Sequence, residues 1–119
     1  MISEGCIINA KAIKKSVIGN RSRIGEGTVI ENSYIMGNDF YQSLTDMKED
    51  IENENQLIGI GERCYINHAL VDKNCRIGND VYINGGKHLT NCSEELYCIK
   101  DGIVVIKKGK TLPDNFRIE

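Results

Sequence analysis

Residues 16–27 read SVIGNRSRIGEG, and this stretch decides the fold. Within it, Ile18 and Ile24 are six residues apart, and a glycine directly follows each of them. An amphipathic helix would place apolar residues every three to four positions, whereas a strict period of six with small residues between suits short strands joined by turns. We therefore interpret each Ile-Gly pair as an apolar wall residue followed by a bend.

The period of six continues outside this stretch. Its positions are Ile18, Ile24, Ile30, Met36, Ile60, Ile66, Val71, Ile77, Ile83, Ile106, Leu112 and Ile118. One step, from Ile66 to Val71, takes five residues instead of six. An internal repeat of this kind indicates a solenoid, in which aliphatic side chains stack on those of the neighbouring coils. Burial stabilises each isoleucine by roughly 1.5–3 kcal/mol, but only when a neighbouring coil covers it.

A second inward position is predicted four residues after each aliphatic residue. Small or aliphatic residues occupy it, namely Ser22, Thr28, Cys64, Cys75 and Val81. Tyr34 departs from this pattern, and its large ring requires a locally wider core or an outward path. Packing thus explains Cys64 and Cys75 without redox chemistry. The five cysteines include no C-x-x-C pair, and we interpret them as reduced thiols.

Residues 38–57 interrupt the repeat and are predicted to form an insertion loop. They carry six acidic residues and one lysine, a net charge of −5. Within them, Leu44, Met47 and Ile51 have helical spacing, which suggests a short amphipathic helix.

A second insertion loop is predicted at about residues 84–98. It opens with Asn-Gly-Gly and is followed by the strand-like GIVVI at 102–106. Without the two loops, the remaining chain suffices for about four to five coils of three hexads each. We therefore predict one all-β solenoid domain over residues 1–119.

Composition limits the classes of function. The net charge of −2, from 15 basic and 17 acidic residues, gives no overall basic field for nucleic acid or an anionic membrane. No apolar run approaches the ~18 residues that a membrane span requires, and no basic-then-apolar leader follows Met1. We therefore expect a soluble, intracellular protein that binds neither nucleic acid nor membrane.

Several longer strings resemble one family, in order and over essentially the whole chain. They are GCII at 5–8, SVIGNRSRIGEG at 16–27, YIMGNDFYQ at 34–42, IGIGERCYI at 58–66, LVDKNCRIG at 70–78 and DGIVVIKKG at 101–109. They resemble the C-terminal domain of glucose-1-phosphate adenylyltransferases (ADP-glucose pyrophosphorylases), most closely the plant and cyanobacterial type. That domain is a hexapeptide-repeat, left-handed parallel β-helix. The left hand opposes the usual rule for parallel crossovers, so it is implied by the resemblance alone.

The resemblance also implies what this chain lacks. In the family, an N-terminal nucleotidyltransferase domain makes ADP-glucose and pyrophosphate from ATP and glucose 1-phosphate, in glycogen and starch biosynthesis. That domain, with its Gly-rich nucleotide loop, is absent here. The fragment alone is then not an enzyme and has no catalytic residues, no metal and no cofactor, because Mg²⁺ and ATP belong to the missing domain. The expected partners are that domain and further subunits, in a homo- or hetero-oligomer such as a tetramer, in the cytoplasm or, for a plant or alga, in a plastid.

Lys73 and Lys108 match family lysines that bind a phosphorylated activator, and the resemblance therefore assigns them to an anionic effector site. Phosphate and carboxylate groups are bound well by point charges that reach out from a rigid wall. Arg21 and Arg23 in GNRSRIG are weaker candidates for the same site.

Two other functions are compatible with a hexapeptide β-helix. One is a free-standing acyltransferase, which would use a histidine as general base, and the chain offers His68 and His88. The other is a purely structural module that assembles subunits through its coil ends and exposed edge. Zinc-dependent carbonic anhydrase chemistry is set aside, because a trimer would supply six histidines where three His-ligated sites need nine.

Overall fold

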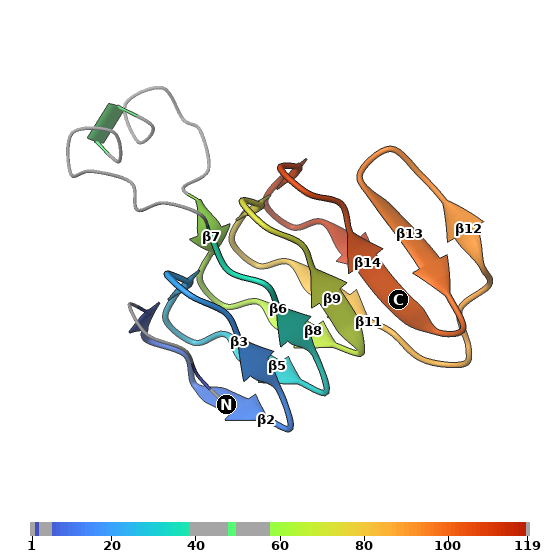
Figure 1. The fold of residues 1–119 in the computed structure, drawn as a ribbon, viewed down its shortest axis with the longest axis horizontal. Coiled ribbons are helices and arrows are strands. Elements are labelled where there is room, and N and C mark those ends of the chain that lie inside the picture. Colours follow the sequence, from blue (N-terminus) through green and yellow to red (C-terminus); the bar gives the residue numbers. More distant parts are fainter. Residues whose placement is uncertain (1, 3–5, 39–47, 50–57, 119) are drawn as a thin grey trace.

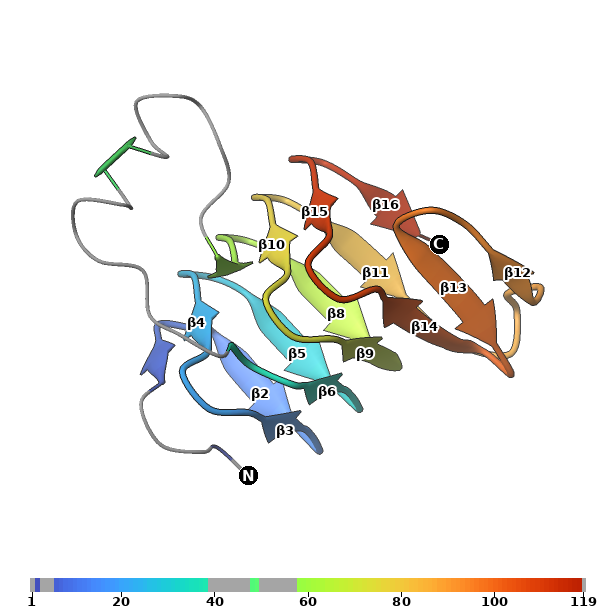
Figure 2. The same ribbon diagram turned by 45° about the horizontal axis from the view of Figure 1, so that its top comes forward.

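The computed structural model describes residues 2, 6–38, 48–49 and 58–118. In this part of the chain, short strands wind around a common axis and form three sheets, in which strands of successive coils pair in parallel (Figures 1 and 2). The chain visits the sheets in a fixed order, one strand in each, before the next coil begins, except that residues 92–106 place three successive strands in one sheet. The protein is therefore a parallel β-helix, and the described strands make between four and five coils, as the repeat predicts.

We number the sheets in the order in which the chain visits them. Sheet I contains β1 (Ile7–Ile8), β4 (Arg23–Ile24), β7 (Gly59–Ile60), β10 (Arg76–Ile77) and β15 (Thr111–Leu112). Sheet II contains β2 (Ala12–Lys14), β5 (Val29–Glu31), β8 (Tyr65–Asn67), β11 (Tyr82–Asn84) and β16 (Arg117–Ile118). Sheet III contains β3 (Val17–Ile18), β6 (Tyr34–Ile35), β9 (Ala69–Val71), β14 (Ile103–Ile106), β13 (Tyr97–Lys100) and β12 (Cys92–Ser93).

From β2 onward each uninterrupted coil contains 17 residues rather than 18, because the step from sheet II to sheet III takes five residues. The first coil, from Ile8 to Ile24, contains 16 residues, because its step from sheet I to sheet II also takes five. The prediction that Met36 is a core residue is wrong because of the five-residue step from sheet II to sheet III. Ile35 takes that place, with 4% of its surface exposed, and pairs with Ile18 on one side and Val71 on the other. The five-residue step seen at Ile66–Val71 thus also occurs one coil earlier, at Ile30–Ile35.

The second inward position is confirmed. All five residues predicted there are buried, namely Ser22, Thr28, Cys64, Cys75 and Val81. The buried hydroxyl of Thr28 donates to Gly61 O at 2.8 Å and accepts from Cys64 N at 3.1 Å, so it joins two coils. In the next hexad Ser33 is buried, and Tyr34 points outward with 46% of its surface exposed.

The five cysteines form no disulfide in the structure. Burial raises the pKa of the Cys64 and Cys75 thiols, which disfavours their thiolate forms. These two residues therefore act as small apolar packing groups.

The two predicted insertions differ in what the structure describes. The predicted helix with Leu44, Met47 and Ile51 lies outside the described residues. The segment 84–98 contains β12 and the first part of β13, which extend sheet III through antiparallel pairing with β14. Leu96 and Tyr97 of this segment pack against the core cluster, and the Tyr97 ring meets Phe116 edge-on with ring centroids 5.9 Å apart. The second insertion therefore covers part of the C-terminal end of the coil.

Among the residues that the structure describes, no helix is long and apolar enough to cross a lipid bilayer.

Candidate anion site at the corner between sheets III and I

Lys73 and Lys108 lie on consecutive coils at the corner where the chain passes from sheet III to sheet I. We call this the lysine corner. Lys73 follows β9 and Lys108 follows β14, and Gly109 N donates to Lys73 O at 3.0 Å, which fixes the register of the two turns. Neighbouring strands are about 4.8 Å apart, so the two lysines lie on adjacent turns of one corner. Residues 35 positions apart in the sequence are thereby brought together.

Several backbone amides of this corner already have partners. Asn74 N donates to Gly37 O at 3.2 Å, and Lys73 N donates to the carboxylate Oδ1 of Asp72 at 2.7 Å. An anion here would therefore be bound by side chains, and not by a nest of backbone amides such as a phosphate-binding loop provides.

The lysines near this corner differ in their surroundings. Lys108 is exposed and Lys73 is half-buried. The Lys107 Nζ donates to Glu94 O, so this side chain is directed towards the segment between β12 and β13. Asp72 is the nearest acidic neighbour in sequence, and its charge opposes part of the field of the two lysines.

Arg21 and Arg23 occupy a different position from the lysines. Arg21 lies at the corner between sheets III and I, two coils before Lys73. Its Nε donates to Asn38 O at 3.0 Å, and Asn38 Nδ2 donates back to Arg21 O at 2.9 Å. The Nε of Arg23, on β4, donates to Ile58 O at 3.1 Å. Asn38 and Ile58 are the described residues on either side of the first insertion. The two arginines thus hold its two ends, and their role in anion binding stays a prediction.

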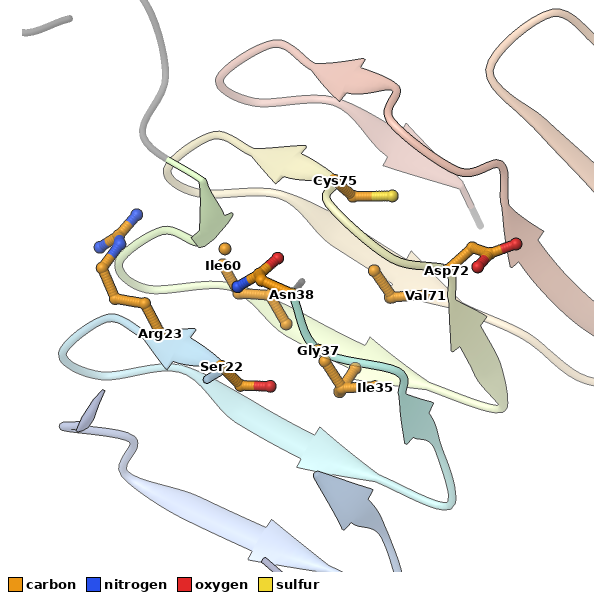
Figure 3. A pocket seen from close by; sticks show the side chains of 10 residues that line it. Ser22, Arg23, Ile35, Gly37, Asn38, Ile60, Val71, Asp72 and Cys75 are labelled. Carbon is orange, nitrogen blue, oxygen red and sulfur yellow. The ribbon is translucent and has the colours of Figure 1, made fainter. Parts of the chain in front are cut away.

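A small cavity lies behind the lysine corner (Figure 3). Its volume of about 10 Å³ is sufficient for about one water molecule. Asn38, Ile60, Val71 and Cys75 line it, whereas the guanidinium of Arg23 is directed away from its centre (Figure 3). The cavity is too small for a sugar phosphate, so an effector would have to bind on the outer surface of the corner.

A larger hollow of about 550 Å³ lies on the surface beside sheet I. Arg23 lines it together with Glu26 and Glu62, and two carboxylates oppose the binding of an anion. Partial burial lowers the pKa of the Arg23 guanidinium, although the charge of Glu62 acts in the opposite direction. This hollow is a poorer anion site than the lysine corner.

Neither predicted histidine is in a catalytic setting. His68 is exposed with φ of 50°, and its Nδ1 is 3.1 Å from Asn67 Oδ1. His88 is exposed in the turn after β11, and neither histidine lines the cavity or the hollow described above. Among the described residues, no three His, Cys, Asp or Glu side chains converge as a metal site requires.

The comparison with known proteins decides the family. The chain matches the model of the GLGC left-handed parallel beta-helix domain over residues 1–116. The chain belongs to this family. The left-handed parallel β-helix expected from the resemblance is therefore confirmed.

This GLGC β-helix is also similar to part of a plant enzyme subunit. It is 41% identical over 115 residues to the glucose-1-phosphate adenylyltransferase small subunit, chloroplastic/amyloplastic, of Triticum aestivum. The match covers 95% of this chain but only 24% of the wheat subunit. The chain thus spans about a quarter of the length of this relative.

Proposed function

We propose that this chain is the C-terminal regulatory and oligomerisation domain of a glucose-1-phosphate adenylyltransferase, in which the lysine corner binds an anionic effector. The family match and the wheat relative support the parent activity, the formation of ADP-glucose and pyrophosphate from ATP and glucose 1-phosphate. The juxtaposition of Lys73 and Lys108 on consecutive coils carries the effector assignment. Arg21 remains a secondary candidate at the same corner.

The chemistry of the corner favours a small phosphorylated molecule. Two ammonium groups on adjacent turns of a rigid wall form charge-assisted hydrogen bonds with phosphate or carboxylate oxygens. A sugar phosphate or a phosphoglycerate has such groups and is small enough to bind at one corner.

Regulation requires that the effector bind two states of the enzyme with different affinity. A ligand with equal affinity for both states would change nothing. We place this difference in affinity at the contact between the effector-bound corner and the catalytic domain. Mg²⁺ and ATP bind in the catalytic domain in this proposal. The parent is an oligomer in this proposal, a tetramer of identical or mixed subunits. It is located in the cytoplasm, or in a plastid if the source is a plant or alga.

The effector assignment predicts a specific loss of activation. In the full-length enzyme, Lys73→Ala and Lys108→Ala are each expected to raise the phosphoglycerate concentration for half-maximal activation about tenfold, which equals a loss of about 1.4 kcal/mol of binding. The activity without effector should stay at the wild-type level, because neither residue belongs to the catalytic domain. Steady-state assays of ADP-glucose formation across effector concentrations measure both quantities.

Lys11→Ala is the matched control, because Lys11 is an exposed lysine before β2, at a different corner. It should leave the activation curve unchanged. Wild-type sensitivity in both Lys73→Ala and Lys108→Ala would overturn the site assignment.

A further inference from the structure

Successive turns are stacked at the corner between sheets III and I. The strands of sheet III that precede them, β3, β6, β9 and β14, lie side by side (Figure 2). The core residues on these strands that the register aligns are Ile18, Ile35, Val71 and Ile106. The residues three positions further along, which we call the corner residues, are Arg21, Asn38, Asn74 and Gly109. Lys73 and Lys108 directly precede the last two of them.

Backbone hydrogen bonds connect successive turns of this stack. Asn38 N donates to Asn20 O at 2.9 Å. On the next coil, Asn74 N donates to Gly37 O at 3.2 Å. The turn that carries Lys73 therefore rests directly on the turn that contains Gly37 and Asn38. A shift of this supporting turn would move the backbone of Lys73.

The Asn38 turn differs from the other turns of the stack in its continuation. In the others, the sheet I strand of the same coil, namely β4, β10 or β15, begins two residues after the corner residue. Asn38 is instead separated from β7, the sheet I strand of its coil, by residues 39–58. The residue with positive φ is also different, because it is Gly37 here, at 88°, and the corner residue itself in the others. The support that a directly following strand gives to the other turns is thus missing at Asn38.

Arg21 supplies contacts at this point. Its Nε donates to Asn38 O at 3.0 Å, and Asn38 Nδ2 donates to Arg21 O at 2.9 Å. Asn38 has only 7% of its surface exposed, and Arg21 is half-buried. Together with the bond to Asn20 O, three hydrogen bonds join Asn38 to the preceding turn. Such bonds are costly to break at a buried group, because no water replaces the lost partner.

We propose that Arg21 is a positioning residue for the lysine corner, which holds the Asn38 turn in place beneath Lys73 and does not contact the anion itself. This inference rests on the proposed function, because the lysine corner is the effector site assigned there. The bond from Nε to Asn38 O orients the guanidinium of Arg21 towards the supporting turn. The anion is then bound by the ammonium groups of Lys73 and Lys108.

Arg21→Lys separates positioning from direct contact with the anion. A lysine keeps the positive charge but has a methylene group where arginine has Nε, so it cannot donate this hydrogen bond to Asn38 O. In the full-length enzyme, we expect the variant to raise the phosphoglycerate concentration for half-maximal activation about fivefold, as the loss of one hydrogen bond predicts. Arg21→Ala should give the same increase. The activity without phosphoglycerate should not change in either variant.

Arg63→Lys is the matched control. Arg63 lies in a turn at the corner between sheets I and II, and its φ of 57° matches the 56° of Arg21. Its Nε also donates a hydrogen bond, to Asp80 Oδ1 at 2.8 Å. The control therefore changes the same atoms in the same backbone conformation at a different corner, and activation by phosphoglycerate should stay at the wild-type level.

Amide hydrogen exchange measures the supporting contact without any effector. In the 119-residue chain, Arg21→Lys should speed the exchange of the Asn74 amide about fivefold, because its acceptor Gly37 O belongs to the supporting turn. The Asp80 amide, which donates to Glu62 O at 2.9 Å, is the reference, and its exchange should not change.

The possible outcomes separate this proposal from its alternatives. Wild-type activation in Arg21→Lys, with a weakened response in Arg21→Ala, would mean that the charge of Arg21 contacts the anion, and the proposal would be wrong. Unchanged exchange of the Asn74 amide would overturn it too, as would faster exchange with wild-type activation in both Arg21 variants. If phosphoglycerate does not activate the wild-type enzyme, the effector assignment fails, and the exchange of the Asn74 amide still decides whether Arg21 holds the turn.

Discussion

Ile66→Ala should cost the β-helix about 2–5 kcal/mol of unfolding free energy, the range for truncating a fully buried isoleucine. Ile66 is 0% exposed and lies on β8, between Ile30 of the coil before and Ile83 of the coil after. Truncation leaves a cavity that both neighbouring coils border, and a rigid stack can close it only partly. Because a domain is stable by only about 5–15 kcal/mol, this single change should shift the urea midpoint markedly. Equilibrium unfolding followed by circular dichroism measures it.

Ile103→Ala is the matched control, since it removes the same atoms from a side chain that is 47% exposed. In the isolated chain its effect should stay within about 0.5 kcal/mol. Equal losses in the two variants would contradict the stacked core as the source of stability.

Gly61→Ala should destabilise the chain through the close approach of its coils, by about 3 kcal/mol. A Cβ at Gly61 would lie 2.5 Å from Gly78 O and 2.6 Å from Asn79 Oδ1. That Asn79 oxygen accepts from Glu62 N at 2.9 Å, so relief of the clash would also break a hydrogen bond between two turns. Because the nearest atoms belong to the backbone of the next coil, the two coils would have to separate at this corner.

Gly109→Ala separates close approach from backbone strain. Gly109 has φ of +70°, but a Cβ there would meet nothing within 4 Å. The left-handed conformation alone should cost about 1–2 kcal/mol. Urea unfolding of both variants gives the comparison, and a loss at Gly61 no greater than that at Gly109 would refute crowding between the coils.

The repeat predicts most of the fold, because each inward position can be recognised from the residues directly around it. Each inward isoleucine has the same local pattern around it, so Ile24, Ile30 and Ile66 can be assigned without knowing the pairing. The prediction that Met36 is a core residue is wrong, because a strict count of six ignores the five-residue step from Ile30 to Ile35. Ile35 enters the core instead, and only its pairing with Ile18 and Val71 shows the change of register.

Features that depend on pairing between strands far apart in the sequence could not be predicted. Antiparallel β12 and β13 arise in a segment without the six-residue period, where no local signal gives the partner strand.

The candidate site, too, could be predicted only in part from the sequence. The sequence identified Lys73 and Lys108 through the family strings, and the coil register shows that they are neighbours. It did not reveal that Arg21 and Arg23 bond to Asn38 and Ile58, because those contacts depend on where the first insertion leaves and rejoins the coil.

The central claim is that the lysine corner itself recognises a phosphorylated anion. The most direct test is a titration of the isotope-labelled chain with phosphoglycerate, followed by amide NMR at low ionic strength, where electrostatic binding is least screened. We predict saturable shifts at Lys73, Asn74, Lys108 and Gly109 that the Lys73→Ala/Lys108→Ala double variant abolishes. Shifts that are absent from this corner, or that persist in the double variant, would contradict the claim.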